Sequence, residues 1–129
     1  MGRPISTMTH GIIDMAVDST MLLAPKLIGA SAQPRGARLV PRLVGAATMA
    51  YNDFTNYEFG IRPKLSMRTH RKLDIIAGAV LAASPFIFRF ARRKRLRSWL
   101  PHVIAGSARV VSAALTKERP GSRRLLPQV

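Results

Sequence analysis

The sequence predicts an all-α fold, a bundle of four transmembrane helices made of two tandem, parallel helical-hairpin repeats. Three observations predict it. Four apolar blocks alternate with clusters of Lys and Arg, the two halves of the chain repeat each other, and 21 Lys and Arg against 6 Asp and Glu give a net charge of +15. At 129 residues, the chain is expected to form a single membrane domain over residues 1–129.

The four apolar blocks lie at residues 11–32, 39–51, 73–88 and 99–115. Residues 75–83 leave no polar face, which a helix on the surface of a soluble protein would need. Gly and Ala are frequent inside the blocks, as expected where membrane helices approach closely. The second and fourth blocks are shorter than the roughly 20 residues of a typical span, and Arg and Lys at their ends can snorkel to compensate. A basic, soluble helical bundle is the alternative.

The positive charge lies between and at the ends of these blocks. A nucleic-acid-binding helix would carry Lys and Arg along one face, so the pattern predicts anionic lipid and not nucleic acid as the polyanionic partner. One dense cluster is expected to contact lipid or a partner protein: Arg89, Arg92, Arg93, Lys94, Arg95 and Arg97. The positive-inside rule does not fix the orientation, because both sides carry equal numbers of Lys and Arg.

An internal repeat with a period of 60 residues is the strongest signal in the sequence. Without any gap, Thr9-His10 recurs as Thr69-His70, Asp14 as Asp74, Pro25 as Pro85, Pro41 as Pro101, and Glu58 as Glu118. The first repeat covers about residues 5–58 and the second about 65–118, followed by a basic tail at 119–129. Because each repeat holds two spans, both enter the membrane in the same direction, related by a pseudo-twofold axis along the membrane normal.

Local signals predict where these helices begin. Thr9 and Thr69 are expected to cap the first helix of each hairpin. Pro41 and Pro101 are expected near the starts of the second helices, where a missing N–H costs least. Three aromatic side chains near the span ends are expected to anchor at the lipid head groups: Tyr51, Tyr57 and Trp99.

Ionisable residues inside the spans are the candidate functional residues. His10, Asp14 and Asp18 share one stripe of the first helix, and His70 and Asp74 form the matching pair on the third. A charge inside a membrane normally faces a partner or a cavity. In a structural interpretation, each Asp accepts hydrogen bonds from its own His and from a neighbouring helix. In a functional interpretation, the pairs form a proton relay, or the His residues ligate a metal or haem.

One asymmetry between the repeats predicts an ion pair. In the ungapped repeat, Asp18 corresponds to Gly78, and Arg109 corresponds to Met49. Asp18 and Arg109 are expected roughly 10–13 Å below the same membrane surface at 1.5 Å per residue. The sequence therefore predicts an Asp18–Arg109 pair between the first and fourth helices.

The hairpin unit resembles the SPW-repeat family of small bacterial membrane proteins. The motif in the first span of each hairpin stands as Ala24-Pro25-Lys26 and Ser84-Pro85-Phe86, with no Trp in either copy. The resemblance covers both repeats, over roughly residues 5 to 118. It implies a two-hairpin fold in the bacterial cytoplasmic membrane, and it implies no activity.

Enzyme chemistry finds little support in the sequence. There is no nucleophile elbow, Gly-rich phosphate loop or His/Glu metal motif, and the absence of cysteine excludes thiolate chemistry. We therefore expect a non-catalytic accessory or scaffold subunit of a larger membrane complex, without a cofactor. The alternative is a proton-handling or haem- or quinone-linked redox protein that uses His10, Asp14, His70 and Asp74.

Overall fold

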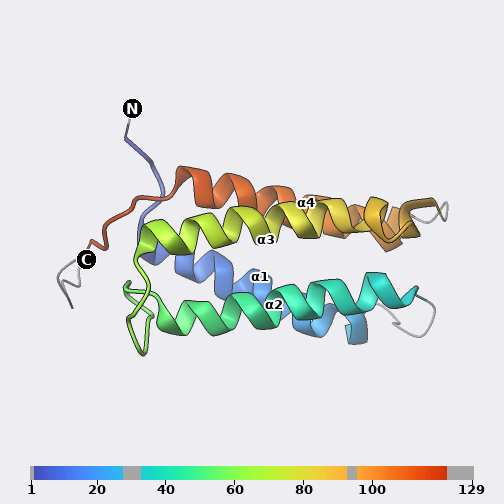
Figure 1. The fold of residues 1–129 in the computed structure, drawn as a ribbon, viewed down its shortest axis with the longest axis horizontal. Coiled ribbons are helices and arrows are strands. Elements are labelled where there is room, and N and C mark those ends of the chain that lie inside the picture. Colours follow the sequence, from blue (N-terminus) through green and yellow to red (C-terminus); the bar gives the residue numbers. More distant parts are fainter. Residues whose placement is uncertain (1, 28–32, 93–95, 122–129) are drawn as a thin grey trace.

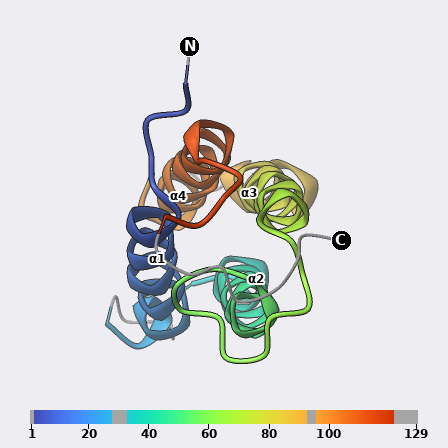
Figure 2. The same cartoon turned by 90° about the vertical axis from the view of Figure 1, so that its left-hand side faces the viewer.

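The computed structural model of the protein describes residues 2–27, 33–92 and 96–121. It contains four long helices, which confirms the predicted all-α, four-helix architecture (Figure 1). The elements are α1 (Thr7–Leu27), α2 (Arg35–Phe54), α3 (Met67–Ile87), a short 3-10 helix η2 (Phe90–Arg92) and α4 (Leu96–Leu115). Seen from the end, α1–α2 and α3–α4 form two hairpins, and α1 and α3 lie at opposite corners of the bundle (Figure 2). Side chains of α1 and α3 can therefore meet at its centre.

The two hairpins begin with the same cap, three residues before the predicted one. The Ser66 hydroxyl accepts a hydrogen bond from the Thr69 backbone N–H at 3.2 Å, and the Ser6 hydroxyl accepts one from Thr9 at 3.0 Å. The prediction that Thr9 and Thr69 are the caps is wrong, because a serine one turn earlier satisfies their N–H groups. Their hydroxyls instead hydrogen-bond the capping serines.

The starts of the second helices also differ from the prediction. Pro41 lies inside α2 and Pro101 inside α4, beyond the first turn of each helix. Both helices begin earlier, over residues with basic side chains that precede the apolar blocks. Each proline therefore removes one hydrogen bond from its helix, and is not placed where the missing N–H costs nothing.

Packing shows that the repeat is offset by 60 residues between α1 and α3 but by 61 between α2 and α4. Gly45 of α2 packs on the backbone oxygen of Asp18, and Gly106 of α4 packs on that of Gly78, which lies 60 residues after Asp18. The buried positions Ala37, Pro41, Gly45, Thr48 and Asn52 of α2 match Ser98, His102, Gly106, Arg109 and Ala113 of α4.

The prediction of an ungapped repeat is therefore wrong for the second helices. A one-residue shift rotates a helix by about 100°, so the face that packs inward fixes the offset. The prolines at 41 and 101 are 60 apart in sequence but do not occupy equivalent positions, since Pro41 is buried and Pro101 is exposed. Thr48, and not Met49, is the counterpart of Arg109.

The two repeats pair with each other at the end of the bundle where α1 and α3 begin and α2 and α4 end. Ile5, before α1, forms an isolated parallel bridge with Thr116, after α4. Leu65, before α3, forms the same bridge with Thr55, after α2. The beginning of each repeat thus pairs with the end of the other, which holds this end of the bundle together.

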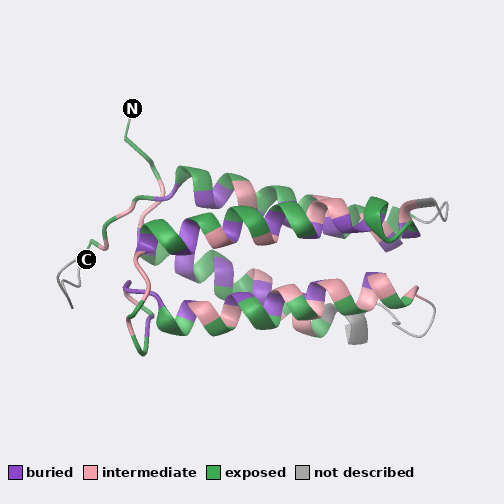
Figure 3. Ribbon diagram, in the orientation of Figure 1, coloured by how far each residue is buried: buried purple, intermediate pink, exposed green. Residues whose placement is uncertain are grey.

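Buried and exposed residues alternate along the helices (Figure 3), and the kinds of residue at these positions are inverted relative to a soluble protein. Among the buried side chains of the described residues, polar and charged ones outnumber hydrophobic ones. Large hydrophobic side chains instead face outward on all four helices, with Ile12, Leu43, Ile76 and Ile104 between 56% and 68% exposed. In a soluble protein, so high a share of polar and charged residues among the buried side chains would be unusual.

Across residues 2–27, 33–92 and 96–121, none of the helices combines enough length with enough apolar character to cross a membrane.

Candidate functional site: a buried His–Asp cluster

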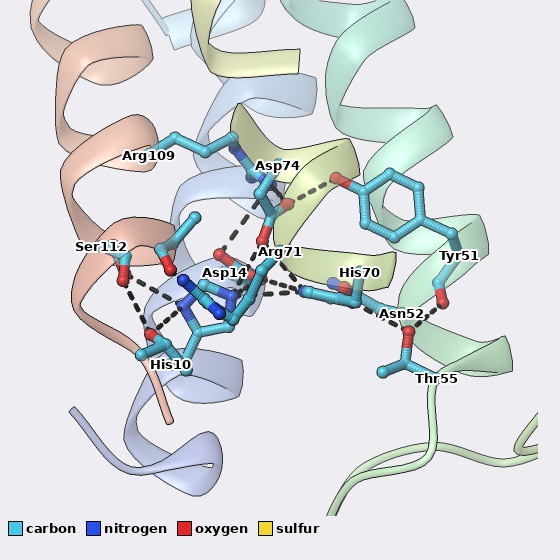
Figure 4. Close-up of polar contacts among 12 residues, drawn as sticks. His10, Asp14, Tyr51, Asn52, Thr55, His70, Arg71, Asp74, Arg109 and Ser112 are labelled. Atoms are coloured by element: carbon cyan, nitrogen blue, oxygen red, sulfur yellow. Dashed lines mark hydrogen bonds and ion pairs between the residues drawn. The ribbon is translucent and has the colours of Figure 1, made fainter. Parts of the chain in front are cut away.

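Two helices bring four ionisable side chains together at the centre of the bundle (Figure 4). His10 and Asp14 come from α1, and His70 and Asp74 come from α3; each side chain is at most 2% exposed. The i, i+4 spacing puts each pair on one face of its helix. Because α1 and α3 are diagonal, both faces point at the same volume.

Each histidine contacts both carboxylates. The Nε2 atom of His10 lies 3.1 Å from Oδ2 of Asp14 and 2.8 Å from Oδ2 of Asp74. The Nε2 atom of His70 lies 3.2 Å from Oδ2 of Asp14 and 3.0 Å from Oδ2 of Asp74. The sequence predicted the pairs within each helix and a contact to a neighbouring helix, and the structure adds that the two pairs bond each other.

Hydroxyl groups hold the other ring nitrogen of each histidine. Thr55 donates its hydroxyl proton to the Tyr51 carbonyl at 2.7 Å, so its oxygen accepts from Nδ1–H of His70 at 2.8 Å. Thr116 donates to the Ser112 carbonyl at 2.7 Å and in the same way accepts from Nδ1–H of His10 at 3.0 Å. The Ser112 hydroxyl also lies 3.0 Å from Nδ1 of His10, and both rings direct Nε2 at the carboxylates.

An arginine and a tyrosine bind the outer side of the cluster. Arg109 forms the predicted ion pair with Asp18, and its Nη1 lies 2.8 Å from Oδ1 of Asp74 and 3.8 Å from Oδ1 of Asp14. The Tyr51 hydroxyl also donates to Oδ1 of Asp74. All of these side chains except Tyr51 are fully or almost fully buried.

Gly78, the counterpart of Asp18 on α3, has uncharged neighbours on α4 of its own hairpin, as Asp18 has Gly45 on α2. Gly78 packs against Gly106 and Val110, and a Cβ atom at Gly78 would lie 2.6 Å from the Gly106 oxygen. The predicted contact between Gly78 of α3 and Met49 of α2 stays a prediction, and by the 61-residue offset Thr48 is the residue that corresponds to Arg109.

The cluster needs additional positive charge. Three carboxylates face one guanidinium, which leaves two negative charges uncompensated while both imidazoles are neutral. An uncompensated charge away from water is costly, so the cluster must hold protons or a cation.

Haem does not fit between the two histidines. Their Nε2 atoms are 3.2 Å apart, and the Asp14 and Asp74 oxygens lie where a macrocycle would have to pass. The cluster can instead hold protons or a single small ion.

Several residues of the site were not predicted from the sequence. Thr55, Ser112 and Thr116 lie at helix ends, where hydroxyl side chains are common and carry no specific signal. Tyr51 was expected at the lipid head groups but turns inward to Asp74, and Tyr57 is also buried. The prediction of these two tyrosines as interfacial anchors is therefore wrong, because the polar centre and Gly11 give them inward partners.

A second cluster of ion pairs, largely exposed, lies at the end of the bundle where α1 and α3 begin. Glu118 accepts hydrogen bonds from Arg3 at 2.6 Å, Arg71 at 3.0 Å and Arg68 at 3.2 Å. The hydrogen bonds from Arg3 and Arg68 lower the pKa of Glu118 to about 2. Arg71 also donates to the Ala113 carbonyl in the last turn of α4, which satisfies a helix-end acceptor.

The predicted lipid-contact cluster is described only in part. Arg89 and Arg97 are exposed at the opposite end of the bundle from His10. Arg93, Lys94 and Arg95 lie outside the described residues, as does the side chain of Arg92. Contact of this cluster with lipid stays a prediction.

The family model described as SPW repeat domain matches residues 8–116, which includes both hairpins and all of the His–Asp cluster. The chain belongs to the SPW repeat family. In the second copy of the SPW motif, Ser84 donates its hydroxyl to the Leu81 carbonyl at 2.7 Å, Pro85 is buried, and Phe86 packs near Trp99 with ring centroids 6.3 Å apart. Trp99 of α4 thus lies beside the position that holds Trp in the motif. No curated protein and no solved structure matches the chain.

Proposed function

We propose that this SPW repeat protein is a multi-pass protein of the bacterial cytoplasmic membrane that serves as a non-catalytic accessory or scaffold subunit of a larger membrane complex. The observation that carries the membrane placement is the inverted burial pattern. Ile76 and Ile104 face outward at 60% exposure each, while Asp18 and Asp74 are 0% exposed. In water this arrangement would expose apolar surface and bury charge, both unfavourable; in lipid it satisfies both.

The bundle interior supports a structural role. The His–Asp cluster and the Asp18–Arg109 pair bond across α1, α3 and α4, so the hairpins are fixed relative to each other. A pocket between the hairpins, lined in part by Met21, Leu81 and His102, holds about 120 Å³. Small-molecule sites typically hold about 300–1,000 Å³, so this pocket is small for a substrate.

The outer surface supports a role in binding lipid or partner helices. Its apolar side chains are spread over all four helices, and Arg89 and Arg97 are exposed at one end. Basic side chains at a helix end attract anionic lipid head groups at about 1 kcal/mol each near the surface.

Fractionation and native mass spectrometry test this proposal. Tag-free protein produced in a bacterial host should stay in the membrane pellet after an alkaline carbonate wash, and should leave it with mild detergent. Gentle-detergent purification from the natural source should then give a stoichiometric complex with other membrane proteins. Release by carbonate would contradict the membrane placement, and a lone species with bound lipid only would contradict the accessory role.

A proton-handling function is the second candidate, and the convergence of four titratable side chains favours it. Liposomes that contain the protein would then dissipate an imposed pH gradient faster than empty liposomes. The His70→Asn variant would lose this activity and His102→Asn, outside the cluster, would keep it. Equal rates for the protein and for empty liposomes would exclude this candidate.

A further inference from the structure

The geometry points to a metal site that goes beyond the proposed scaffold role: His10, Asp14, His70 and Asp74 bind one divalent transition-metal ion of the Zn²⁺ type, which links α1 to α3. Each residue offers one ligand atom, and the four atoms all lie within 4.8 Å of one another. Two imidazole nitrogens and two carboxylate oxygens are ligands that Zn²⁺ and its first-row neighbours accept.

Five of the six distances among the ligand atoms are close to those of tetrahedral coordination. Four ligand atoms about 3.3–3.4 Å apart surround a centre roughly 2.0–2.1 Å from each, which matches Zn–N and Zn–O bond lengths. The four Nε2–Oδ2 distances and the distance between the two Nε2 atoms run from 2.8 to 3.2 Å, and all four ligand atoms lie within 4.8 Å of one another. For these five pairs, an ion at the centre requires the atoms to move apart by a few tenths of an ångström.

The tautomers of both histidines suit a metal. Thr55 and Thr116 each use their proton on a backbone carbonyl, so they accept from Nδ1–H of His70 and His10. Both neutral imidazoles then direct the Nε2 lone pair at the centre of the cluster. Metal-ligating histidines almost always donate their second N–H in this way, which fixes the ring and raises its basicity.

The carboxylates are held in the same manner. In both Asp14 and Asp74, Oδ2 faces the histidines and Oδ1 faces Arg109, at 3.8 and 2.8 Å from Nη1 respectively. Tyr51 also donates to Oδ1 of Asp74. Every ligand thus directs one atom at the centre and binds a fixed partner with the other, the arrangement of a preorganised metal site.

A divalent cation would satisfy the charge balance of the cluster. One divalent cation cancels the two negative charges that Arg109 leaves uncompensated. Two additional protons would also cancel them, but would place two imidazolium N–H groups 3.2 Å apart at Nε2. Like charges and donors at that distance repel, whereas two ligand atoms of one metal normally lie this close.

Cobalt titration of the full chain tests the site, because tetrahedral Co²⁺ has visible absorption bands and substitutes for Zn²⁺. Tag-free protein in detergent is stripped with a chelator and titrated with Co²⁺, then with Zn²⁺. We expect about one Co²⁺ per chain, displacement by Zn²⁺, and a rise in melting temperature with either ion because the ion binds only the folded state. His70→Asn should abolish all three, and the matched control His102→Asn should retain them.

A variant that keeps all four ligands tests whether misfolding explains the loss of Co²⁺ binding in His70→Asn. Thr55→Val removes only the group that holds Nδ1 of His70, and should weaken Co²⁺ binding by about 10- to 100-fold while the absorption bands keep their tetrahedral shape. If the wild-type protein binds no more Co²⁺ than His70→Asn, or if Thr55→Val binds as tightly as wild type, the metal site is refuted.

Discussion

Removal of the Arg109 guanidinium tests the buried charge network most severely. Arg109→Met keeps an unbranched apolar side chain of similar length, but leaves Asp18 and Asp74 without their ion-pair partner. Breaking a buried ion pair from one side typically costs about 3–5 kcal/mol, since the remaining charge stays buried. We expect a loss near the upper end of that range, because Arg109 is 3% exposed and serves two carboxylates.

The double variant Arg109→Met/Asp18→Asn separates charge from packing. It removes the carboxylate that depends most directly on Arg109, so it should be more stable than Arg109→Met alone, with a coupling free energy on the order of 2 kcal/mol. Arg97→Met, on the exposed face of the same helix, is the matched control and should change stability by less than about 0.5 kcal/mol.

Unfolding by SDS in mixed micelles, followed by circular dichroism, gives the free energies for this cycle. If Arg109→Met were no less stable than Arg97→Met, the network would contribute nothing to the fold. If the double variant were less stable than Arg109→Met, the two side chains would not act as a pair.

Further predictions follow from the packing, the backbone and the surface charges. Gly106→Ala would place a Cβ atom 2.5 Å from the Ala82 backbone nitrogen, whereas Gly45→Ala at the equivalent position of the other hairpin has its nearest contact at 3.2 Å. In the same SDS unfolding assay we expect a loss of about 1–3 kcal/mol for the first and less for the second, and equal losses would contradict the tighter packing at Gly106. Arg89 has a φ of 57°, so Arg89→Gly should be about 1 kcal/mol more stable than Arg89→Ala, which removes the same charge, and a more stable alanine variant would contradict this. The pKa of Glu118 is lowered from 4.5 to about 2, so its stabilising effect is complete above pH 4.5 and is lost as the pH falls through 2; the difference in melting temperature between wild type and Glu118→Gln should therefore shrink over that range, and a constant difference would exclude ionisation as its cause.

Local patterns were sufficient to predict the helices and the composition of the cluster. The His and Asp spacing on α1 recurs unchanged on α3, so one periodicity places both pairs on inward faces. The Asp18–Arg109 pair was also predictable, because helix rise alone puts the two residues at the same depth.

Contacts that depend on helix rotation were not predictable from the same patterns. The coincidence of Pro41 and Pro101 suggested a register in which Met49 matches Arg109, but the close approach of Gly45 and Gly106 to the neighbouring helices sets a different one. A rotation of about 100° per residue decides which side chains reach the centre. The same reason explains why Tyr51 was expected at the lipid surface and lies against Asp74 instead.

The close approach of the four potential metal ligands also depends on three-dimensional packing. The sequence places each His–Asp pair on its own helix, but only the diagonal arrangement of α1 and α3 brings the two pairs within bonding distance (Figure 2). The threonines that fix the ring tautomers come from segments after α2 and α4, which the repeat pattern does not relate to the histidines.

The central claim is that the outward faces of this bundle contact lipid, and cysteine labelling tests it most directly. The chain has no native cysteine, so Ile76→Cys on the outer face of α3 and Arg62→Cys in the exposed loop between α2 and α3 each provide a single thiol. In permeabilised bacterial membranes, a charged, water-soluble maleimide should label Arg62→Cys rapidly and leave Ile76→Cys unlabelled until SDS is added. Equal labelling of both thiols before SDS would show that the outer faces contact water, and would contradict the account.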